Sequence, residues 1–106
     1  MTKNDYILQV NNLQTYFTLD TGTLKAVDDV TFRLRRNETI GIIGESGCGK
    51  SITSHSILRT IQPPGRVVGG SILYDDGVAG PVDLAKEKPD GKYMRSLRGR
   101  EISMIF

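Results

Sequence analysis

The stretch that decides the fold covers residues 44–51 and reads Gly44-Glu45-Ser46-Gly47-Cys48-Gly49-Lys50-Ser51. It matches the pattern G-x-x-x-x-G-K-[ST] at every fixed position, and this pattern is typical of a loop that binds nucleotide phosphates. The glycines keep the loop free of side chains and allow positive φ, so that several backbone N–H groups can point at one anion. The sequence therefore predicts a cradle for the phosphates of a nucleotide.

The last two residues of this motif have separate expected roles. Lys50 can reach the β- and γ-phosphates as a point charge, and the Ser51 hydroxyl can bind the Mg²⁺ that bridges them. A helix that begins here adds unpaired N–H groups and the positive end of its dipole. A nucleoside triphosphate with Mg²⁺ is the ligand that this arrangement favours.

The residues on either side of the motif fit a strand, a loop and a helix. The continuous apolar character of Thr39–Ile43 predicts a central strand that is covered on both faces. A helix is expected from about Lys50 to Thr60, and Pro63-Pro64-Gly65 stops it. Its buried face is expected to carry Ser54, Ile57, Leu58 and Ile61. The one histidine, His55, is interpreted as a surface or packing residue without a function.

Upstream of the motif, the pattern predicts antiparallel strands. Two short strands, Tyr6–Val10 and Leu13–Phe17, are expected to join near Asn11-Asn12, and Asp20-Thr21-Gly22 is a turn signal. Apolar and polar residues alternate over Val30–Arg35, which predicts a half-exposed antiparallel strand. Together with the central strand, these elements predict a mixed sheet.

Downstream, the segments are shorter and more polar. Ser71–Tyr74 predicts a strand, and Asp75–Gly91, rich in Gly, Pro, Asp and Lys, predicts a surface excursion. One or two helical turns are expected over Tyr93–Arg98, followed by a buried strand over Glu101–Phe106. Three carboxylates of the excursion are interpreted as solvated surface groups: Asp75, Asp76 and Asp83.

Composition limits the classes of function. The 106 residues fit at most one small domain, and 38% hydrophobic with 25% charged residues is ordinary for a soluble globular protein. A net charge of +2, evenly spread, argues against nucleic acid as a partner. One cysteine excludes an internal disulfide framework, and no apolar run approaches the ~20 residues that span a bilayer. The polar start lacks the apolar region of a signal peptide, so the chain is expected to be cytosolic.

The order of these segments resembles the N-terminal part of the ATP-binding subunit of an ABC transporter. The segments that carry the resemblance are Leu13–Phe17, Ala26–Val30, Gly41–Ser51, Gly70–Tyr74 and Leu97–Phe106. Arg98-Gly99 ahead of the last strand, with the long excursion over residues 75–92, is similar to the importer branch for oligopeptides and dipeptides. Cys48 stands where such a loop carries a serine, at a position that offers chiefly its backbone N–H.

The resemblance implies an α/β fold, the P-loop NTPase core, with antiparallel N-terminal strands and a mixed sheet. Residues 1–106 would form the N-terminal part of an ABC-type ATP-binding domain, ending one residue before the glutamine of the Q-loop. The motif would bind ATP and Mg²⁺, with Ser51 as the metal ligand, and Phe17 would stack on adenine, with Tyr16 as the alternative. The catalytic glutamate, the signature sequence and the switch histidine would lie beyond Phe106, so no catalytic residue is expected within the chain.

The resemblance also implies partners and a location. Transmembrane permease subunits and a second ATP-binding subunit would assemble with the parent protein at the cytoplasmic face of the membrane, where ATP hydrolysis drives transport. Two alternatives stay open: another P-loop enzyme such as a small-molecule kinase, and a nucleotide-binding fragment without turnover. The strands expected before the first central strand favour the transporter subunit, because kinases of this fold usually begin with that central strand.

Overall fold

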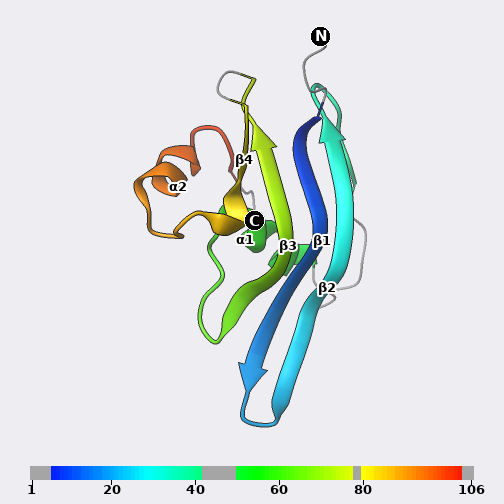
Figure 1. Ribbon diagram of the computed structural model, residues 1–106, viewed down its shortest axis with the longest axis vertical. Helices are drawn as coiled ribbons and strands as arrows, with labels where there is room; N and C mark the ends of the chain where they lie inside the picture. The colour runs from blue at the N-terminus through cyan, green and yellow to red at the C-terminus, as the bar shows by residue number, and fades with distance from the viewer. Residues whose placement is uncertain (1–5, 42–49, 78–79, 104–106) are drawn as a thin grey trace.

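The computed structural model describes residues 6–41, 50–77 and 80–103, and these form one antiparallel sheet with helices beside it (Figure 1). The strand order in the sheet is β2-β1-β3-β4. The elements in chain order are β1 (Tyr6–Leu19), β2 (Gly22–Arg35), α1 (Lys50–Leu58), β3 (Gly65–Asp75), β4 (Pro81–Asp83), the 3-10 helix η1 (Leu84–Lys86) and α2 (Lys92–Leu97). No helix among the described residues is long and apolar enough to cross a membrane.

The first two strands form a long hairpin. Leu19 pairs with Gly22, which confirms the predicted turn at Asp20–Gly22. The expectation of two strands joined near Asn11-Asn12 is wrong, since β1 is continuous through these residues. Asn12 adopts a left-handed conformation, with φ of 50°, at an irregularity of the pairing. Such a bulge accommodates an extra residue and bends the strand without ending it.

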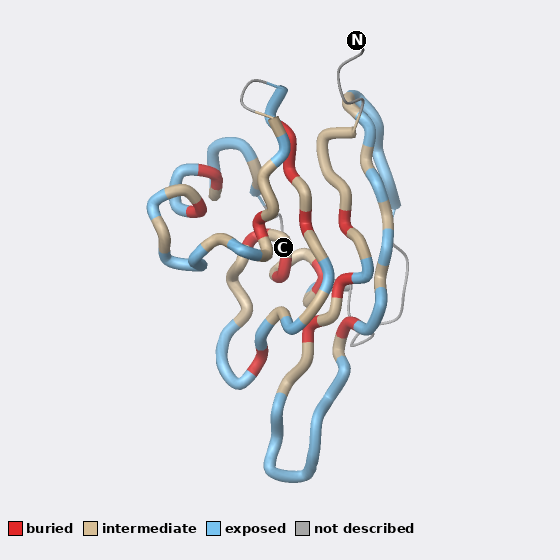
Figure 2. The backbone as a smooth tube through the Cα atoms, in the orientation of Figure 1, coloured by how far each residue is buried: buried red, intermediate tan, exposed pale blue. Residues whose placement is uncertain are grey.

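Strand β2 has the predicted alternation. Val30, Phe32 and Leu34 are half-buried, whereas the residues between them are exposed. The core lies on the side of the sheet that carries α1 and α2, and Figure 2 shows its buried residues around the middle of the sheet, with the hairpin end exposed. The buried cluster consists of Val10, Leu13, Val27, Ile72, Tyr74, Leu84, Met94 and Leu97.

The prediction of a mixed sheet is wrong for the described residues, because every strand pairing in their sheet is antiparallel. Residues 39–41 of the expected central strand are not in a strand, and Ile42 and Ile43 lie outside the described residues. At the C-terminal end, Ile102 makes an isolated parallel bridge to Arg98, and residues 104–106 lie outside the described part. An apolar run indicates burial but does not supply the neighbouring strand that its N–H and C=O groups need.

The predicted surface excursion over Asp75–Gly91 is also partly wrong, because it contains β4 and η1 and contributes Leu84 to the core. Asp83 is half-buried, and its Oδ1 accepts hydrogen bonds from the backbone N–H groups of Ile72 and Ala85, both at 3.0 Å. Asp75 is 7% exposed, with Oδ1 3.4 Å from the Arg36 guanidinium. These two carboxylates therefore bind strand and loop groups rather than solvent.

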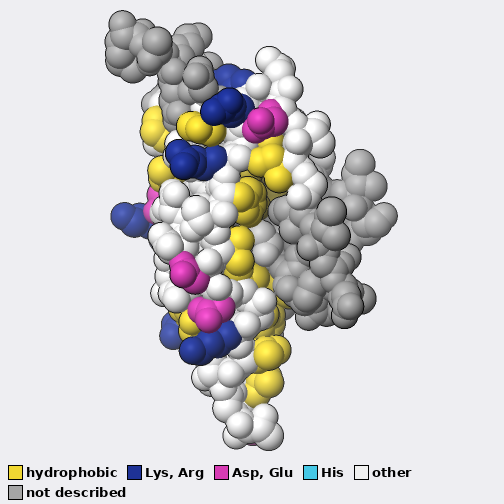
Figure 3. Space-filling model, turned by 90° about the vertical axis from the view of Figure 1, so that its right-hand side faces the viewer, with side chains coloured by type: hydrophobic (Ala, Val, Ile, Leu, Met, Phe, Trp, Pro, Cys, Tyr) yellow, Lys and Arg dark blue, Asp and Glu magenta, His cyan; other side chains and the backbone are white. Residues whose placement is uncertain are grey.

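Figure 3 views the molecule from the β2 edge and shows hydrophobic side chains in a strip along the long axis. Lysine, arginine and acidic side chains are interspersed on the same face. Of the large hydrophobic residues, Leu24 in β2 is 53% exposed and Leu19 in β1 is 45% exposed. Both belong to the hairpin end, so this end of the sheet presents apolar surface to solvent.

Candidate phosphate-binding site

The predicted phosphate loop falls partly outside the described residues, and its last two positions begin α1. Residues 44–49 are not described, whereas Lys50 and Ser51 are the first residues of the helix. This confirms the predicted start of the helix at the end of the motif. The first turn contains no acidic residue, and Ser51 is exposed there. The first turn of α1 therefore offers N–H groups and a positive dipole end, and none of the residues of this turn is acidic.

A polar contact ties α1 to the sheet. Ser56 and Thr15 are fully buried, and their hydroxyl oxygens lie 2.7 Å apart. The Ser56 hydroxyl donates to the backbone C=O of Ile52, so Thr15 is the donor to Ser56. This contact orders the helix against β1, because each buried hydroxyl has a partner.

The predicted buried face of this helix is partly correct, since Leu58 is buried and Ile57 packs against the core. Ser54 and Ile57 are half-buried, whereas Thr53 and Ser56 are buried. Ile61, expected on the same face, lies beyond the helix. Apolar periodicity could not find Thr53 and Ser56 because both carry hydroxyl groups, which pattern analysis counts as polar.

The helix ends earlier than the proline signal indicates. Arg59 has a φ of +59°, the N–H of Thr60 donates to the C=O of His55 at 2.9 Å, and the N–H of Arg59 donates to the C=O of Ser56 at 3.2 Å. These two bonds form a Schellman motif with an arginine at the position that glycine usually occupies. Nδ1 of His55 lies 2.7 Å from Oγ1 of Thr60, so the histidine is part of this helix end.

The two neighbouring aromatic residues of β1 point to opposite faces. Strand alternation places Phe17 on the same face as Thr15, which is the side of α1. Its ring lies against Gly65 in the paired strand, where an added Cβ would come within 2.4 Å of it. Tyr16 faces the other way, and its hydroxyl donates to Oδ1 of Asp28 at 2.7 Å. That hydrogen bond is the main cause that raises the pKa of Tyr16.

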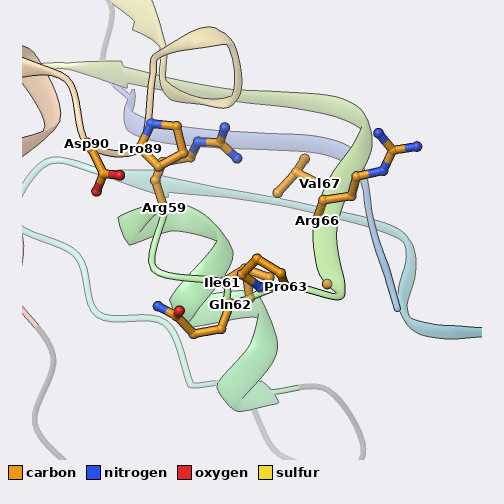
Figure 4. A pocket seen from close by; sticks show the side chains of 9 residues that line it. Arg59, Ile61, Gln62, Pro63, Arg66, Val67, Pro89 and Asp90 are labelled. Carbon is orange, nitrogen blue, oxygen red and sulfur yellow. The ribbon is translucent and has the colours of Figure 1, made fainter. Parts of the chain in front are cut away.

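A cavity of about 490 Å³ lies beyond the C-terminal end of α1 (Figure 4). It is lined by Arg59, Ile61, Gln62, Pro63, Gly65, Arg66, Val67, Pro89 and Asp90. Figure 4 shows the side chain of Arg66 pointing away from Arg59. The two cations therefore do not converge on one anion, and Asp90 adds a negative charge. This cavity is not the predicted phosphate site.

Within the described residues, no group of three His, Cys, Asp or Glu side chains is arranged to hold a metal ion. Ser51, the expected magnesium ligand, is an exposed residue in the first turn of α1.

Comparison with known proteins identifies one family and several relatives of this chain. Residues 27–106 match the family model described as ABC transporter. The chain is 45% identical over 101 residues to the dipeptide transport ATP-binding protein DppD of Bacillus subtilis, with 94% of this chain and 28% of that protein covered. It is 43% identical to the oligopeptide transport ATP-binding protein AppD of the same organism, with 94% of this chain and 29% of the relative covered. A putative peptide import ATP-binding protein of Brucella abortus is 41% identical, with 94% and 28% covered.

The chain thus spans under a third of the length of the curated relatives that it matches.

Proposed function

Because the chain belongs to the ABC transporter family, we propose that it is the N-terminal part of an ATP-binding, energy-coupling subunit of an importer for oligopeptides or dipeptides. The family match and the predicted phosphate loop that leads into α1 carry this proposal. The hairpin of β1 and β2 ahead of that loop supports it over the small-molecule kinase alternative. The names of the relatives support the choice of peptides as cargo.

In the proposed site, the backbone of residues 44–49 and the Lys50 ammonium bind the triphosphate of ATP. Ser51 is the ligand to Mg²⁺, which neutralises phosphate charge when it is bound. The N-terminus of α1 contributes its N–H groups, and the Thr15–Ser56 contact holds that helix against the sheet.

We place the adenine against Phe17. This residue shares its face with the contact to α1, and its ring rests on the bare backbone of Gly65. Leu24, directly opposite in β2, is half-exposed and extends the apolar surface. Tyr16 is the weaker choice, because it points to the other face and Lys25 Nζ lies 5.6 Å from its ring centre.

In this proposal, the parent protein binds permease subunits and a second ATP-binding subunit at the cytoplasmic face of the membrane. Hydrolysis would use groups from the remainder of the parent and from that second subunit.

Titration of the chain with a fluorescent ATP analogue and Mg²⁺ tests the site. We expect Lys50→Ala to weaken binding roughly tenfold or more, because a charge-assisted hydrogen bond contributes about 1.5–3 kcal/mol. Cys48→Ser should change binding little, since that position contributes chiefly its backbone N–H. Equal losses in both variants would contradict the assignment of the loop.

The cargo is tested separately in the source cells. Disrupting the gene that encodes this chain should reduce the uptake of a labelled dipeptide or oligopeptide. Unchanged peptide uptake, with ATP binding intact in the purified chain, would contradict the peptide assignment while leaving the nucleotide site in place.

A further inference from the structure

Gly65, the first residue of β3, lies against the ring of Phe17. The two residues are paired across β1 and β3. A Cβ built on Gly65 would lie closer than 3.0 Å to three ring atoms of Phe17, namely Cε2, Cζ and Cδ2, and real Cβ atoms do not come so close to other atoms. The ring therefore occupies the space that the side chain of any other residue at position 65 would need.

Hydrogen bonds hold the backbone around Gly65 in place. The N–H of Gly65 donates to the C=O of Gln62 at 2.9 Å, and the N–H of Thr18 donates to the C=O of Pro64 at 3.4 Å. Gly65 is also buried. Because a shift of this backbone would stretch both hydrogen bonds, a side chain at residue 65 would displace the ring of Phe17 and not the strand.

The ring of Phe17 has a second place to lie, over β2. On that side Phe17 pairs with Leu24, and residues directly opposite one another on neighbouring strands share a face of the sheet. Leu24 is 53% exposed, so the surface beside it is open. Rotation about the Cα–Cβ bond carries the ring between its staggered positions. The bare backbone of Gly65 therefore favours the position over β3.

The position of the ring matters because aromatic systems attract each other in offset-stacked or edge-to-face arrangements. Phe17 is half-buried, which leaves part of its side chain accessible to a ligand. We propose that Gly65 is a positioning residue for base stacking: it keeps the ring over β3, where the accessible part of the ring meets the adenine. This inference rests on the proposed function, in which adenine stacks on Phe17. It concerns the base and not the phosphates, because the predicted phosphate loop covers residues 44–51.

Gly65→Ala tests the inference in the full chain through two ligands. Isothermal titration calorimetry measures the affinity for MgATP and for the magnesium complex of tripolyphosphate, which has the phosphates but no base. We expect MgATP binding to weaken roughly tenfold, since a stacked base is worth roughly 5- to 150-fold in affinity. Binding of tripolyphosphate should not change. A variant that is only less stable would lose affinity for both ligands, so the ratio of the two affinities separates positioning from destabilisation.

Gly69→Ala is the matched control, because Gly69 is also a glycine of β3 that faces a side chain of β1. An added Cβ would meet the amide oxygen of Gln14, which is the far end of a flexible side chain. Neither Gly65 nor Gly69 has a left-handed φ that would strain an alanine. Gln14 precedes Thr15 and so points to the face away from α1. The ratio of the two affinities should stay at its wild-type value in Gly69→Ala.

A double variant tests whether Gly65 acts through the ring. In a Phe17→Ala background there is no ring to displace, so adding Gly65→Ala should not lower the ratio of the two affinities any further. The inference is overturned if the ratio is unchanged in folded Gly65→Ala. It is also overturned if Gly69→Ala lowers the ratio equally, or if the ratio falls further in the double variant. Circular dichroism establishes that each variant is folded at the temperature of the titrations.

The wild-type chain provides a measurement that does not depend on a variant folding. In the MgATP complex, NMR should show nuclear Overhauser effects from the ring protons of Phe17 both to the α-protons of Gly65 and to the adenine protons. If the effect to adenine is missing, or if Phe17→Ala keeps the wild-type ratio, the proposed place of the adenine fails and the inference fails with it. If the effect to adenine is present and the effect to Gly65 is missing, the inference alone is overturned.

Discussion

At the scale of single residues, the strand position of an aromatic side chain decides what it can contact. Phe17 and Tyr16 are neighbours in sequence, yet alternation turns Phe17 to the side of α1 and Tyr16 to the side where Asp28 accepts its hydroxyl. Both side chains are aromatic, so their chemistry alone does not decide which of them stacks on a nucleotide base. The face of the sheet to which each side chain points decides it.

This difference predicts unequal effects on nucleotide binding. Phe17→Ala should weaken MgATP binding by roughly 5- to 150-fold, because stacking of a base on an aromatic ring is worth about 1–3 kcal/mol. Phe17→Tyr keeps the ring and should restore binding, and Tyr16→Phe should have little effect. The same fluorescence titration measures all three. A larger loss for Tyr16→Phe than for Phe17→Ala would reverse the assignment.

Tyr74 predicts a dependence of stability on pH at the same scale. Burial, followed by the hydrogen bond from its hydroxyl to Glu101, raises its pKa from 10.0 to about 12. The folded state therefore holds the proton more tightly, so this contribution to stability is complete below pH 10.0 and is lost between pH 10.0 and about 12. Tyr74→Phe should remove this part of the alkaline loss, as urea unfolding at about pH 9 and pH 11 would show. An equal loss of stability with rising pH in the wild type and in Tyr74→Phe would contradict this prediction.

At the scale of elements, short segments depend on side chains that replace backbone hydrogen bonds. Asp83 is the last residue of β4 and the N-cap of η1, where its Oδ1 accepts a hydrogen bond from the N–H of Ala85. The same oxygen accepts a hydrogen bond from the N–H of Ile72 in β3. A strand of three residues contributes few ladder hydrogen bonds, so this carboxylate adds to the pairing of β4 with β3 and to the burial of Leu84 in attaching the two elements to the sheet.

We therefore expect Asp83→Ala to lower the free energy of unfolding by about 1–3 kcal/mol, because two N–H groups lose their acceptor. Asp83→Asn keeps an oxygen acceptor and should cost less. Asp90→Ala, at an exposed position of the following loop, is the matched control. Urea unfolding measures all three, and equal effects of Asp83→Ala and Asp90→Ala would show that the cap contributes nothing.

At the scale of the whole molecule, several carboxylates have structural partners. Asp75 and Asp83 bind Arg36 and backbone N–H groups, Glu101 accepts from Tyr74, and Asp28 accepts from Tyr16. A carboxylate that activates water must instead face the γ-phosphate with a free oxygen. Each of these four carboxylates has a structural contact in the described residues.

Accordingly, the purified chain should bind MgATP without turning it over. Its rate of phosphate release should equal that of Lys50→Ala, measured in a steady-state assay of both proteins. A rate well above that of Lys50→Ala would mean that a catalytic carboxylate lies within residues 1–106, and Glu45 in the predicted loop would be the first to replace.

Sequence by itself determined the family, the start of α1 at Lys50, the turn at Asp20–Gly22 and the alternation of β2, because each depends on residue types at fixed local spacing. Tertiary structure decided what depends on partners far apart in the chain. The continuity of β1 through Asn12, the burial of Asp83 and the contact of Thr15 with Ser56 are of this kind. From local sequence, a polar residue is expected to be exposed to solvent. Folding can instead bury it with a hydrogen-bond partner, and local sequence does not show which distant residue that partner is.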